Sequence, residues 1–399
     1  MSERLAIDGG TPVRKKLLPY GRQSIDEHEI AAVAEVLRSD WLTTGPKVAE
    51  FERAVAAVAG AKEAVAVSNG TAALHAAMYA IGIGPGDEVI VPTMTFAASA
   101  NCAAFLGGVP VFVDVDPDTL LIDPDLIEAK ITEKTKAVVA VDYAGQPCDY
   151  DRLQPIVDRH GLVLVDDACH AIGGSYKGRP AGSLAVLNTF SFHPVKHVTT
   201  GEGGAITSDD PELIRRMRMF RNHGITTDFR QRETAGSWVY DMVDLGYNYR
   251  LSDIQCALGV TQLAKLPQSI ARRQAIAAKY GAAFAKMSGV RPLSVHKDVS
   301  HAYHLYVIQL ELEKLIVDRG QVFQALRAEG IGVNVHYRPV HLHPYYRTHF
   351  GTKPGDCPVA EAAYERLISL PMFPAMTDQD VCDAIEGVRK VIEHYRRGN

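Results

Sequence analysis

The 399-residue sequence lacks long apolar runs, paired cysteine motifs and any excess of basic residues. No segment reaches the ~18 consecutive apolar residues that suggest a membrane-spanning helix. The N-terminal stretch MSERLAIDGGTPVRKK has charges on both sides of a very short apolar segment, so it does not resemble a secretory signal peptide. We therefore expect a cytoplasmic protein without a membrane partner.

The six cysteines are scattered along the chain and none belongs to a CxxC pair, which argues against a zinc site or a disulfide framework. We expect reduced, buried cysteines and no metal. The formal net charge of −5 leaves no basic surplus for binding nucleic acid. Recognition of a phosphate would have to come from a few local residues, and a small anionic ligand remains compatible with the composition.

The composition, with 47% hydrophobic and 22% charged residues, is typical of a folded globular protein. Short runs rich in valine and isoleucine alternate with helical patterns, and these runs are EAVAVSNG, DEVIVP, VPVFVDVD, KAVVAVDY and GLVLVDDA. Helices are predicted over about 71–79 and 97–106. Apolar runs separated by helices predict an α/β fold with a mostly parallel sheet, whose ligands bind beyond the carboxyl ends of the strands.

The length of the chain favours two domains. After YRLSDIQCALGVTQLAKL comes a long charged helical segment, PQSIARRQAIAAKYGAAFAKM. More alternation and fewer parallel-type runs then follow, up to a final helix near residues 378–395. We predict a large α/β domain over residues 1–264, which includes an N-terminal arm, and a smaller α+β domain over residues 265–399.

Two aspartates, Asp166 and Asp167, end the apolar run GLVLVDDACHAIG, and His170 follows three residues later. Ionised carboxylates are rarely buried unless they are paired, so we expect a cationic partner here, with one of the two facing a ligand. Because aspartate is also a favoured helix N-cap, the alternative is that both cap a following helix.

The segment SNGTAAL, residues 68–74, follows a predicted strand and opens a predicted helix. Free backbone amides and the positive end of the helix dipole would suit a phosphate at this position. Ordinary N-cap chemistry explains the same residues without a ligand, so both interpretations stay open.

Lys196 lies in FSFHPVKHVTTGEGGAI between His193 and His197, neither of which has an assigned role. A lysine in a polar segment is ordinarily a solvated cation. Here the glycine-rich tail allows close approach of the backbone, and desolvation or nearby positive charge would make the amine a nucleophile that forms Schiff bases. An anion cradle, an aspartate for a ring nitrogen and such a lysine are together what pyridoxal 5′-phosphate requires of a protein.

At this point the sequence resembles the DegT/DnrJ/StrS family of nucleotide-sugar aminotransferases, which have the aspartate-aminotransferase-like fold type I. The likeness covers nearly the whole chain through the segments SDWLTTGPKVAEFE, SNGTAAL, TFAASANC, VDYAGQPCD, VDDACHAIG, SFHPVKHVTTGEGG, LGYNYRLSDIQCALGVTQL and VHYRPVHLHPYY. So long an ordered series of motifs is highly specific for this family.

The resemblance implies a role for each matching residue. Lys196 bonds covalently to pyridoxal phosphate and later moves a proton between the cofactor and the substrate carbon, Asp167 pairs with the pyridine nitrogen, and His170 lies near the cofactor's hydroxyl. The other residues implied to contact the cofactor are Phe96 against the ring, Gly70, Thr71 and Ser191 at the phosphate, and Asn248 at the phosphate of the neighbouring subunit's cofactor. The implied active unit is a homodimer with shared active sites.

Within the family, SFHPVK, VDYAGQPC, HLYVIQL and VHYRPV look most like the pseudaminic-acid branch. These enzymes transfer an amino group from L-glutamate to C4 of a UDP-linked 4-keto-6-deoxy-N-acetylhexosamine. Arg250 is the candidate for the carboxylate of the donor, with a structural salt bridge as the alternative. Candidate contacts of the nucleotide sugar, each with an alternative role at the surface or core edge, are Arg221, Arg230, His336 and Tyr337.

Other functions are compatible with parts of the sequence. The N-terminal LAIDGGTPV looks like relatives that act on other substrates, so amination at C3, or of a dTDP- or GDP-linked sugar, stays open. A related dehydratase or deoxygenase is disfavoured, because those relatives replace the lysine, typically with histidine. A pyridoxal phosphate-binding regulatory protein without turnover is a further alternative.

Overall fold

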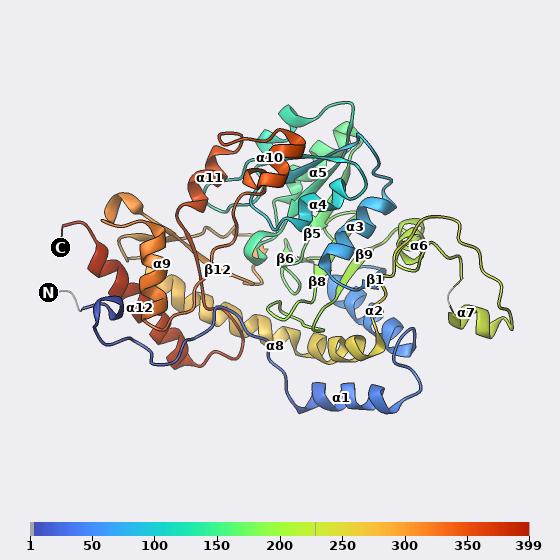
Figure 1. Ribbon diagram of the computed structural model, residues 1–399, viewed down its shortest axis with the longest axis horizontal. Coiled ribbons are helices and arrows are strands. Elements are labelled where there is room, and N and C mark those ends of the chain that lie inside the picture. Colours follow the sequence, from blue (N-terminus) through green and yellow to red (C-terminus); the bar gives the residue numbers. More distant parts are fainter. Residues whose placement is uncertain (1–3, 228, 399) are drawn as a thin grey trace.

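The computed structural model describes residues 4–227 and 229–398 and has a seven-stranded sheet at its centre (Figure 1). The strand order is β1-β9-β8-β5-β4-β2-β3. Strand β9 is antiparallel to both of its neighbours, and the other neighbouring pairs are parallel. The strands are β1 (Glu63–Val67), β2 (Glu88–Pro92), β3 (Val109–Val113), β4 (Thr135–Val141), β5 (Val163–Asp167), β8 (Leu187–Ser191) and β9 (Gly204–Ser208). The predicted α/β class is confirmed.

Two smaller sheets complete the strands of the structure. One consists of β10 (Val290–Pro292), β12 (Tyr306–Leu310) and β13 (Leu367–Leu370). The other consists of β6 (Ser175–Tyr176), β7 (Arg179–Pro180) and β11 (Val299–Ser300). All their pairings are antiparallel, in contrast to the central sheet.

Helices cover the central sheet and connect its strands. The α-helices are α1 (Glu27–Arg38), α2 (Pro46–Ala59), α3 (Gly70–Ala80), α4 (Ala98–Ala104), α5 (Tyr150–His160), α6 (Pro211–Phe220), α7 (Phe229–Thr234), α8 (Asp253–Phe284), α9 (Arg319–Ala328), α10 (Pro344–Phe350), α11 (Pro358–Tyr364) and α12 (Asp378–Tyr395). Short 3-10 helices are η1 (Ala6–Asp8), η2 (Pro124–Leu126), η3 (Glu128–Lys130), η4 (Tyr143–Gly145), η5 (Leu312–Lys314) and η6 (Val340–Leu342). The helices predicted near 71–79, 97–106 and 378–395 correspond to α3, α4 and α12.

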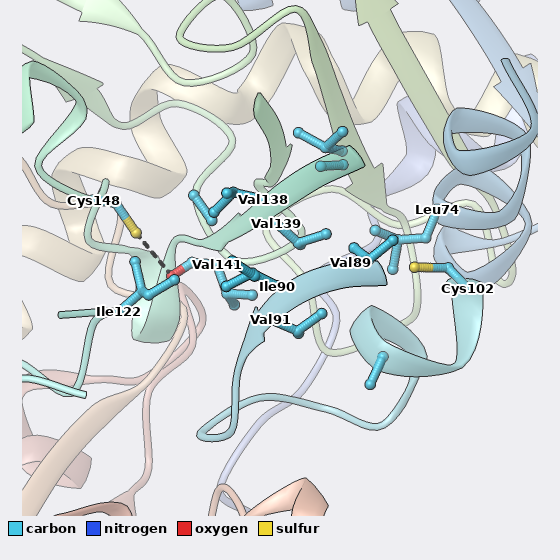
Figure 2. Close-up of a cluster of buried hydrophobic side chains, with 14 of the residues drawn as sticks. Leu74, Val89, Ile90, Val91, Cys102, Ile122, Val138, Val139, Val141 and Cys148 are labelled. Carbon is cyan, nitrogen blue, oxygen red and sulfur yellow. Dashed lines mark hydrogen bonds between the residues drawn. The ribbon is translucent and has the colours of Figure 1, made fainter. Parts of the chain in front are cut away.

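The central strands are apolar along their whole length because both faces of the sheet are covered. Val89 and Val91 of β2, and Val138 and Val139 of β4, are completely buried in one cluster (Figure 2). Consecutive valines would expose every second side chain if one face met solvent, so their burial explains the continuous apolar runs. Cys148 joins this cluster as a free thiol that donates to the Val141 carbonyl at 3.2 Å.

Helix α8 runs through the predicted domain boundary without interruption. Its first half packs Leu263 and Leu266 with Phe51 of α2, whereas its second half places Tyr280 and Phe284 in a separate cluster with β12, β13 and α12. Figure 1 shows α8 along the lower side of the molecule, reaching from α2 to α12. The division at residue 265 stays a prediction, and its boundary falls within a helix that contributes to both clusters.

The N-terminal arm packs against the second cluster, which contains Leu5 and Leu18. Glu329 anchors the arm: its carboxylate accepts hydrogen bonds from the Ala6 amide at 2.7 Å and from a second arm amide at 2.9 Å. This fully buried carboxylate also forms an ion pair with Lys390. The arm, which we predicted as part of the large domain, therefore contacts residues of the predicted smaller one.

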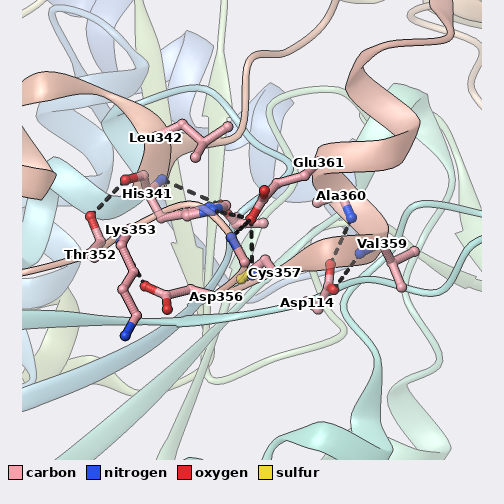
Figure 3. A network of polar contacts seen from close by, with 12 residues as sticks. Asp114, His341, Leu342, Thr352, Lys353, Asp356, Cys357, Val359, Ala360 and Glu361 are labelled. Atoms are coloured by element: carbon pink, nitrogen blue, oxygen red, sulfur yellow. Dashed lines mark hydrogen bonds and ion pairs between the residues drawn. The ribbon is translucent and has the colours of Figure 1, made fainter.

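A buried polar network ties the C-terminal region to the loop after β2 (Figure 3). His341 contacts Glu361 Oε1 through Nε2 at 3.0 Å and Thr93 Oγ1 through Nδ1 at 2.6 Å. Asp114 accepts hydrogen bonds from two amides at the start of α11. Because Thr93 begins the loop that continues to Phe96, the network fixes the start of a loop that reaches the candidate site.

Within the described ranges, no helix combines the length and the apolar character needed to cross a bilayer. The same residues contain no group of three or more His, Cys, Asp or Glu side chains arranged to hold a metal ion.

Candidate active site

A cavity of about 860 Å³ lies where the carboxyl ends of β1, β2, β5 and β8 meet. This is the edge at which an α/β sheet binds ligands. The predicted residues that line it are Gly70, Thr71, Phe96, Asp167, His170, Ser191, Lys196, His336 and Tyr337. The fold thus brings together residues separated by more than 200 positions, although their individual roles stay predictions.

Lys196 lines this cavity from the loop between β8 and β9. Its side-chain amine has no hydrogen-bond acceptor among the residues that the structure describes. Desolvation lowers the pKa of Lys196, and the nearby Cys169 and Asp167 oppose that shift. A lysine with a lowered pKa carries an uncharged, nucleophilic amine more often than a solvated lysine does.

Asp167 ends β5 and is held at the cavity wall by two donors. Its Oδ2 accepts a 2.6 Å hydrogen bond from Ser99 Oγ, and its Oδ1 accepts one of 3.3 Å from the Cys169 amide. The Thr95 hydroxyl lies 2.7 Å from Ser99 Oγ and extends the chain. Sequence reasoning assigned no role to Ser99 or Thr95, although both belong to TFAASANC, one of the segments that carry the family resemblance.

Asp166 points away from Asp167, as neighbouring residues of a strand do. It is fully buried, and among the described residues no cation pairs with its carboxylate, which has only the Tyr150 hydroxyl close by without a well-formed hydrogen bond. Asp142 lies nearby, and its Oδ1 accepts hydrogen bonds from the Cys148 amide and the Tyr150 hydroxyl. Burial raises the pKa of Asp142 to about 7 and that of Asp166 well above its ordinary value.

The alternative in which both aspartates cap a helix is wrong, because the segment immediately after β5 forms turns. The expected cationic partner is also missing for Asp166 among the described residues. The raised pKa of Asp166 explains how it can be buried without a cation, because a protonated carboxyl group is far less costly to bury than an ionised one. Asp167 is the aspartate that faces the cavity.

The start of α3 forms an open cradle at the cavity. Asn69 caps the helix by accepting a 2.8 Å hydrogen bond from the Ala72 amide. The amides of Gly70 and Thr71 have no acceptor among the described residues, and they adjoin the cavity. A Cβ on Gly70 would lie 2.8 Å from Cβ of Ser191, so only glycine leaves this space open. Both interpretations of SNGTAAL therefore apply, because the cap is made and two amides remain for an anion.

Aromatic rings form another wall of the cavity. Phe96 keeps 59% of its surface exposed, which is unusual for phenylalanine, and its ring centroid lies 6.0 Å from that of Tyr337. The Tyr337 hydroxyl contacts His170 Nε2 at 3.1 Å, and His336 Nδ1 contacts the Ser369 hydroxyl at 2.8 Å. Burial holds the pKa of His170 well below its ordinary value and lowers that of His336 to about 4. Both imidazoles are therefore neutral.

Two predicted residues, on either side of Tyr249 in the chain, lie outside this cavity. Asn248 is exposed and pairs by its backbone with Asn222. Arg250 donates from Nη1 to Asn222 Oδ1 at 2.7 Å and lines a second cavity of about 600 Å³. Burial and the neighbouring Arg221 lower the pKa of Arg250. Within one chain, neither residue meets Lys196.

The two remaining predicted residues are engaged elsewhere. Arg221 forms an ion pair with Glu52 and donates to the Ala66 carbonyl at 2.7 Å, an arrangement that favours its structural alternative. Arg230 is exposed on α7, with its guanidinium 5.8 Å from the ring centroid of Trp41. Figure 1 shows α7 projecting from the body of the molecule.

The histidines beside Lys196 lie in different environments. His193 is exposed and lines the cavity. His197 is buried, and its Nε2 lies 3.0 Å from the carbonyl oxygen of Ala302, which can only accept, so Nε2 carries the hydrogen. Further cavity residues that sequence reasoning did not name are Tyr20, Thr95, Ser99, Glu202, Tyr249, His304 and Asn334.

Comparison with known proteins identifies this arrangement. The model of the DegT/DnrJ/EryC1/StrS aminotransferase family matches residues 23–389. The chain belongs to this family. It is 45% identical over 382 residues to the spore coat polysaccharide biosynthesis protein SpsC of Bacillus subtilis (strain 168), which covers 95% of this chain and 98% of SpsC.

Solved structures agree over almost the whole length. A protein of Streptococcus pneumoniae assigned as a sugar aminotransferase, Spr1654, superimposes in its PMP form with a TM-score of 0.89 at 37% identity, covering 94% of this chain and 99% of that one. Helicobacter pylori PseC, an aminotransferase of pseudaminic acid biosynthesis, has a TM-score of 0.88 at 32% identity and covers 95% and 100%. The predicted family, fold type and enzyme class are confirmed, and the cofactor of this class is pyridoxal 5′-phosphate.

The cavity fits this cofactor. Gly70 leaves the space that a Cβ would fill, beside two free amides at a helix N-terminus, and this suits a phosphate. Asp167 presents a carboxylate without a cationic partner among the described residues, as a protonated ring nitrogen would require. Phe96 offers an uncovered aromatic face, and Lys196 offers its amine. These residues would hold the cofactor in this chain.

Proposed function

We propose that this enzyme transfers an amino group from L-glutamate to C4 of a UDP-linked 4-keto-6-deoxy sugar in two half-reactions of a ping-pong mechanism. The observation that carries the proposal is the convergence of Lys196, Asp167 and the Gly70 cradle in a single cavity of about 860 Å³. This volume exceeds what a cofactor alone needs, so it leaves room for the sugar of a second substrate.

Bound pyridoxal phosphate supplies the electron sink that stabilises negative charge at the substrate carbon. Lys196 holds the cofactor through Nζ and then moves a proton to or from that carbon. Asp167 holds a proton on the ring nitrogen, and Ser99 orients the Asp167 carboxylate. The amides of Gly70 and Thr71, with the Ser191 hydroxyl, bind the phosphate.

Phe96 and His170 complete the cofactor site on two sides. Phe96 would cover the cofactor ring and keep water from it, and His170 would face the cofactor hydroxyl. His336 and Tyr337 are the candidates for sugar contacts, although Ser369 and His170 already engage them. Arg221 and Arg230 are weaker candidates because neither lines this cavity.

The choice of a UDP-linked 4-keto sugar rests on sequence segments shared with the pseudaminic-acid branch and on the similarity to PseC. The similarity to SpsC, a polysaccharide biosynthesis protein, supports a sugar substrate more generally. Glutamate as donor is part of the same proposal.

We propose that the active unit is a homodimer with shared sites. Residues 238–247 expose several large apolar side chains, among them Trp238, with 85% of its surface accessible, and Leu245, with 70%. Such a patch is rarely left open to solvent. It directly precedes Asn248 and Arg250, so an interface here would bring both residues close to the partner subunit, as the resemblance implies for Asn248.

We also propose a cytoplasmic enzyme. All six cysteines are free, and four of them are buried, which fits a reducing compartment.

The decisive experiment supplies the purified enzyme and its cofactor with glutamate and, in turn, UDP-, dTDP- and GDP-linked 3-keto and 4-keto sugars. Mass spectrometry detects the amino sugar, and NMR assigns the aminated carbon. We expect product from the UDP-linked 4-keto sugar. Exclusive amination at C3, or of another nucleotide sugar, would replace the proposed substrate but not the enzyme class.

A half-reaction separates catalysis from mere binding. Glutamate alone should remove the absorbance band of the bound cofactor near the visible edge, and a keto sugar should restore it. A stable band in the presence of glutamate would favour a regulatory protein without turnover. The Lys196→Ala variant serves as the control and should show no glutamate-driven proton transfer.

A further inference from the structure

Two buried imidazoles contact each other at the inner wall of the cavity. The ring centroids of His170 and His304 are 4.3 Å apart and their planes are inclined by 39°. Each side chain retains at most 6% of its exposure. His304 precedes β12 and ends the segment HAYH (residues 301–304); it also begins HLYVIQL, but sequence reasoning gave His304 itself no role.

The rings of Tyr337 and Tyr143 also contact His170, but their centroids lie farther away, at 6.0 Å and 6.5 Å. Its Nε2 contacts the Tyr337 hydroxyl, whereas its Nδ1 is buried and has no partner among the described residues. One polar contact does not fix the plane of a ring that can rotate about it. The ring of His304 makes the nearest of these ring contacts and restrains the imidazole plane most directly.

We propose that His304 is a positioning residue of the cofactor site, whose ring packs against His170 and fixes the orientation in which His170 faces the cavity. The inference rests on the proposed function, because it assigns His170 to the cofactor.

The backbone that carries His304 is held by a buried arginine of α8. Arg273 is 1% exposed and donates from Nη1 to the carbonyls of Tyr303 and Met372, both at 3.0 Å, and to that of His304 at 3.4 Å. Tyr303 has a φ of 49°, in the left-handed region that non-glycine residues rarely adopt. A buried guanidinium that bonds to carbonyls holds this uncommon conformation in place.

Gly145 allows the two histidine segments to approach each other. Its φ is 104°, and a Cβ there would lie 2.7 Å from the His170 carbonyl oxygen and 2.9 Å from the His304 amide nitrogen. Its own carbonyl accepts a 2.8 Å hydrogen bond from the Ala302 amide. Any other residue at position 145 would push the segments, and with them the two rings, apart.

His197 joins the same segment to the lysine loop. Its Nε2 donates to the Ala302 carbonyl, and its ring centroid lies 5.7 Å from that of His304. Because His197 directly follows Lys196, the HAYH segment connects the loop of the lysine with His170. This arrangement gives a structural role to a histidine that the sequence left unexplained.

The charges around His170 agree with a purely steric role for His304. Burial is the main cause that holds the pKa of His170 well below its ordinary value, and a positive charge on Lys196 would lower it further. Tyr337 also faces the ring, and its pKa is raised well above the ordinary value, so the phenol is neutral. Loss of the His304 ring would admit water, and the pKa of His170 would then rise.

The test compares His304→Ala with His304→Phe, which keeps a ring of similar shape. NMR of imidazole-labelled apoprotein gives the pKa of His170, and absorbance titration gives the affinity for pyridoxal phosphate. For His304→Ala we expect a higher pKa of His170 and about tenfold weaker cofactor binding, which corresponds to about 1.4 kcal/mol. His304→Phe should restore most of both values.

Phe284→Leu is the matched packing control, because Phe284 is buried in the second cluster away from the cavity. It should lower the melting temperature without changing the pKa of His170 or the cofactor affinity. A folded His304→Ala protein with unchanged pKa and affinity would overturn the proposal, as would a His304→Phe protein as impaired as His304→Ala. Absence of cofactor binding in the unmodified protein would refute the proposed function instead.

Discussion

Ser99 Oγ donates a 2.6 Å hydrogen bond to Asp167 Oδ2, and both residues are buried at the wall of the cavity. Ser99 comes from α4 and Asp167 from the end of β5, so the bond joins two elements that are 68 residues apart. It leaves the Asp167 carboxylate with a defined orientation before any cofactor binds. Hydrogen bonds to ionised groups are stronger than those between neutral groups.

Replacing Ser99 by alanine should weaken the binding of pyridoxal phosphate. A hydrogen bond to a charged group contributes about 1.5–3 kcal/mol, so the loss should be about tenfold or more. Absorbance titration of the apoprotein measures it. Thr95→Val, which removes only the hydroxyl behind Ser99, should have a smaller effect. Equal affinities for Ser99→Ala and the unmodified protein would show that Asp167 needs no such support.

Replacing Lys196 by methionine should stabilise the apoprotein. Burial lowers the pKa of Lys196, so the unfolded state binds more protons than the folded state between that lowered value and 10.5. Stability therefore rises with pH across this window, and at neutral pH the buried amine destabilises the fold. We expect a gain of about 1 kcal/mol for Lys196→Met, as is common when a functional group is removed. The gain should shrink at alkaline pH.

Denaturant unfolding of the two apoproteins over a pH series tests this prediction. Lys265→Met is a useful comparison, because the pKa of Lys265 is raised through its contacts with Glu29 and Asp26. That variant should lose stability. A destabilised Lys196→Met protein would mean that the lysine is not strained by its environment.

Asp142→Asn should remove a pH dependence of stability. The pKa of Asp142 is raised by burial from 3.8 to about 7, so the folded state binds the extra proton within this window. Its contribution is fully present below 3.8 and is lost as the pH rises through about 7. Asparagine keeps the acceptor for the Cys148 amide but does not ionise. The free energy of unfolding of the variant should therefore change less with pH between 3.8 and about 7 than that of the unmodified protein.

The measurement is urea denaturation at several pH values, with the exposed Asp158→Asn as control. Asp158 lies on the solvent face of α5 and should leave the pH profile unchanged. If Asp142→Asn kept the slope of the unmodified protein, the titrating group would have to be another one, with Asp166 the first to examine.

Gly70→Ala should impair cofactor binding more than folding. The new Cβ would lie 2.8 Å from Cβ of Ser191, inside the cradle at the start of α3. Overpacking of this kind costs about 1–3 kcal/mol. Gly84→Ala is the matched control, since its Cβ would have only Asp87 Oδ2 nearby, at 3.9 Å. Undiminished affinity of Gly70→Ala for pyridoxal phosphate would place the phosphate elsewhere.

Much of the central sheet could be predicted, but strands β8 and β9 could not. Their sequences, LNTFS and GAITS, contain polar residues, yet Asn188, Thr189 and Thr207 are almost completely buried. The Thr207 hydroxyl donates to the Gly182 carbonyl at 2.7 Å, and this hydrogen bond offsets the cost of burying the hydroxyl. A sequence does not reveal that a distant carbonyl will satisfy a hydroxyl group.

The candidate site divides in the same way. Lys196, Asp167 and Gly70 lie in local motifs, and the chemistry of each motif can be inferred from its own segment. Ser99 and His304 belong to the segments TFAASANC and HLYVIQL, but their roles depend on contacts with residues far away in the chain, which no local pattern reveals. In our proposal, Asn248 and Arg250 function only when a second chain is present. A contact between two chains cannot be derived from the residues of one segment.

The sequence by itself determined the alternation of strands and helices, the edge of the sheet where a ligand binds, and the lysine, aspartate and helix start that a cofactor needs. These features follow from local apolar periodicity and from residue types next to strand ends. Only the tertiary structure decided that Asp166 is buried without a cationic partner among the described residues, that α8 continues through residue 265, and that His304 packs on His170. These outcomes depend on which residues, distant in sequence, are buried together. The packing between segments determines this, and the order of residues within a single segment does not.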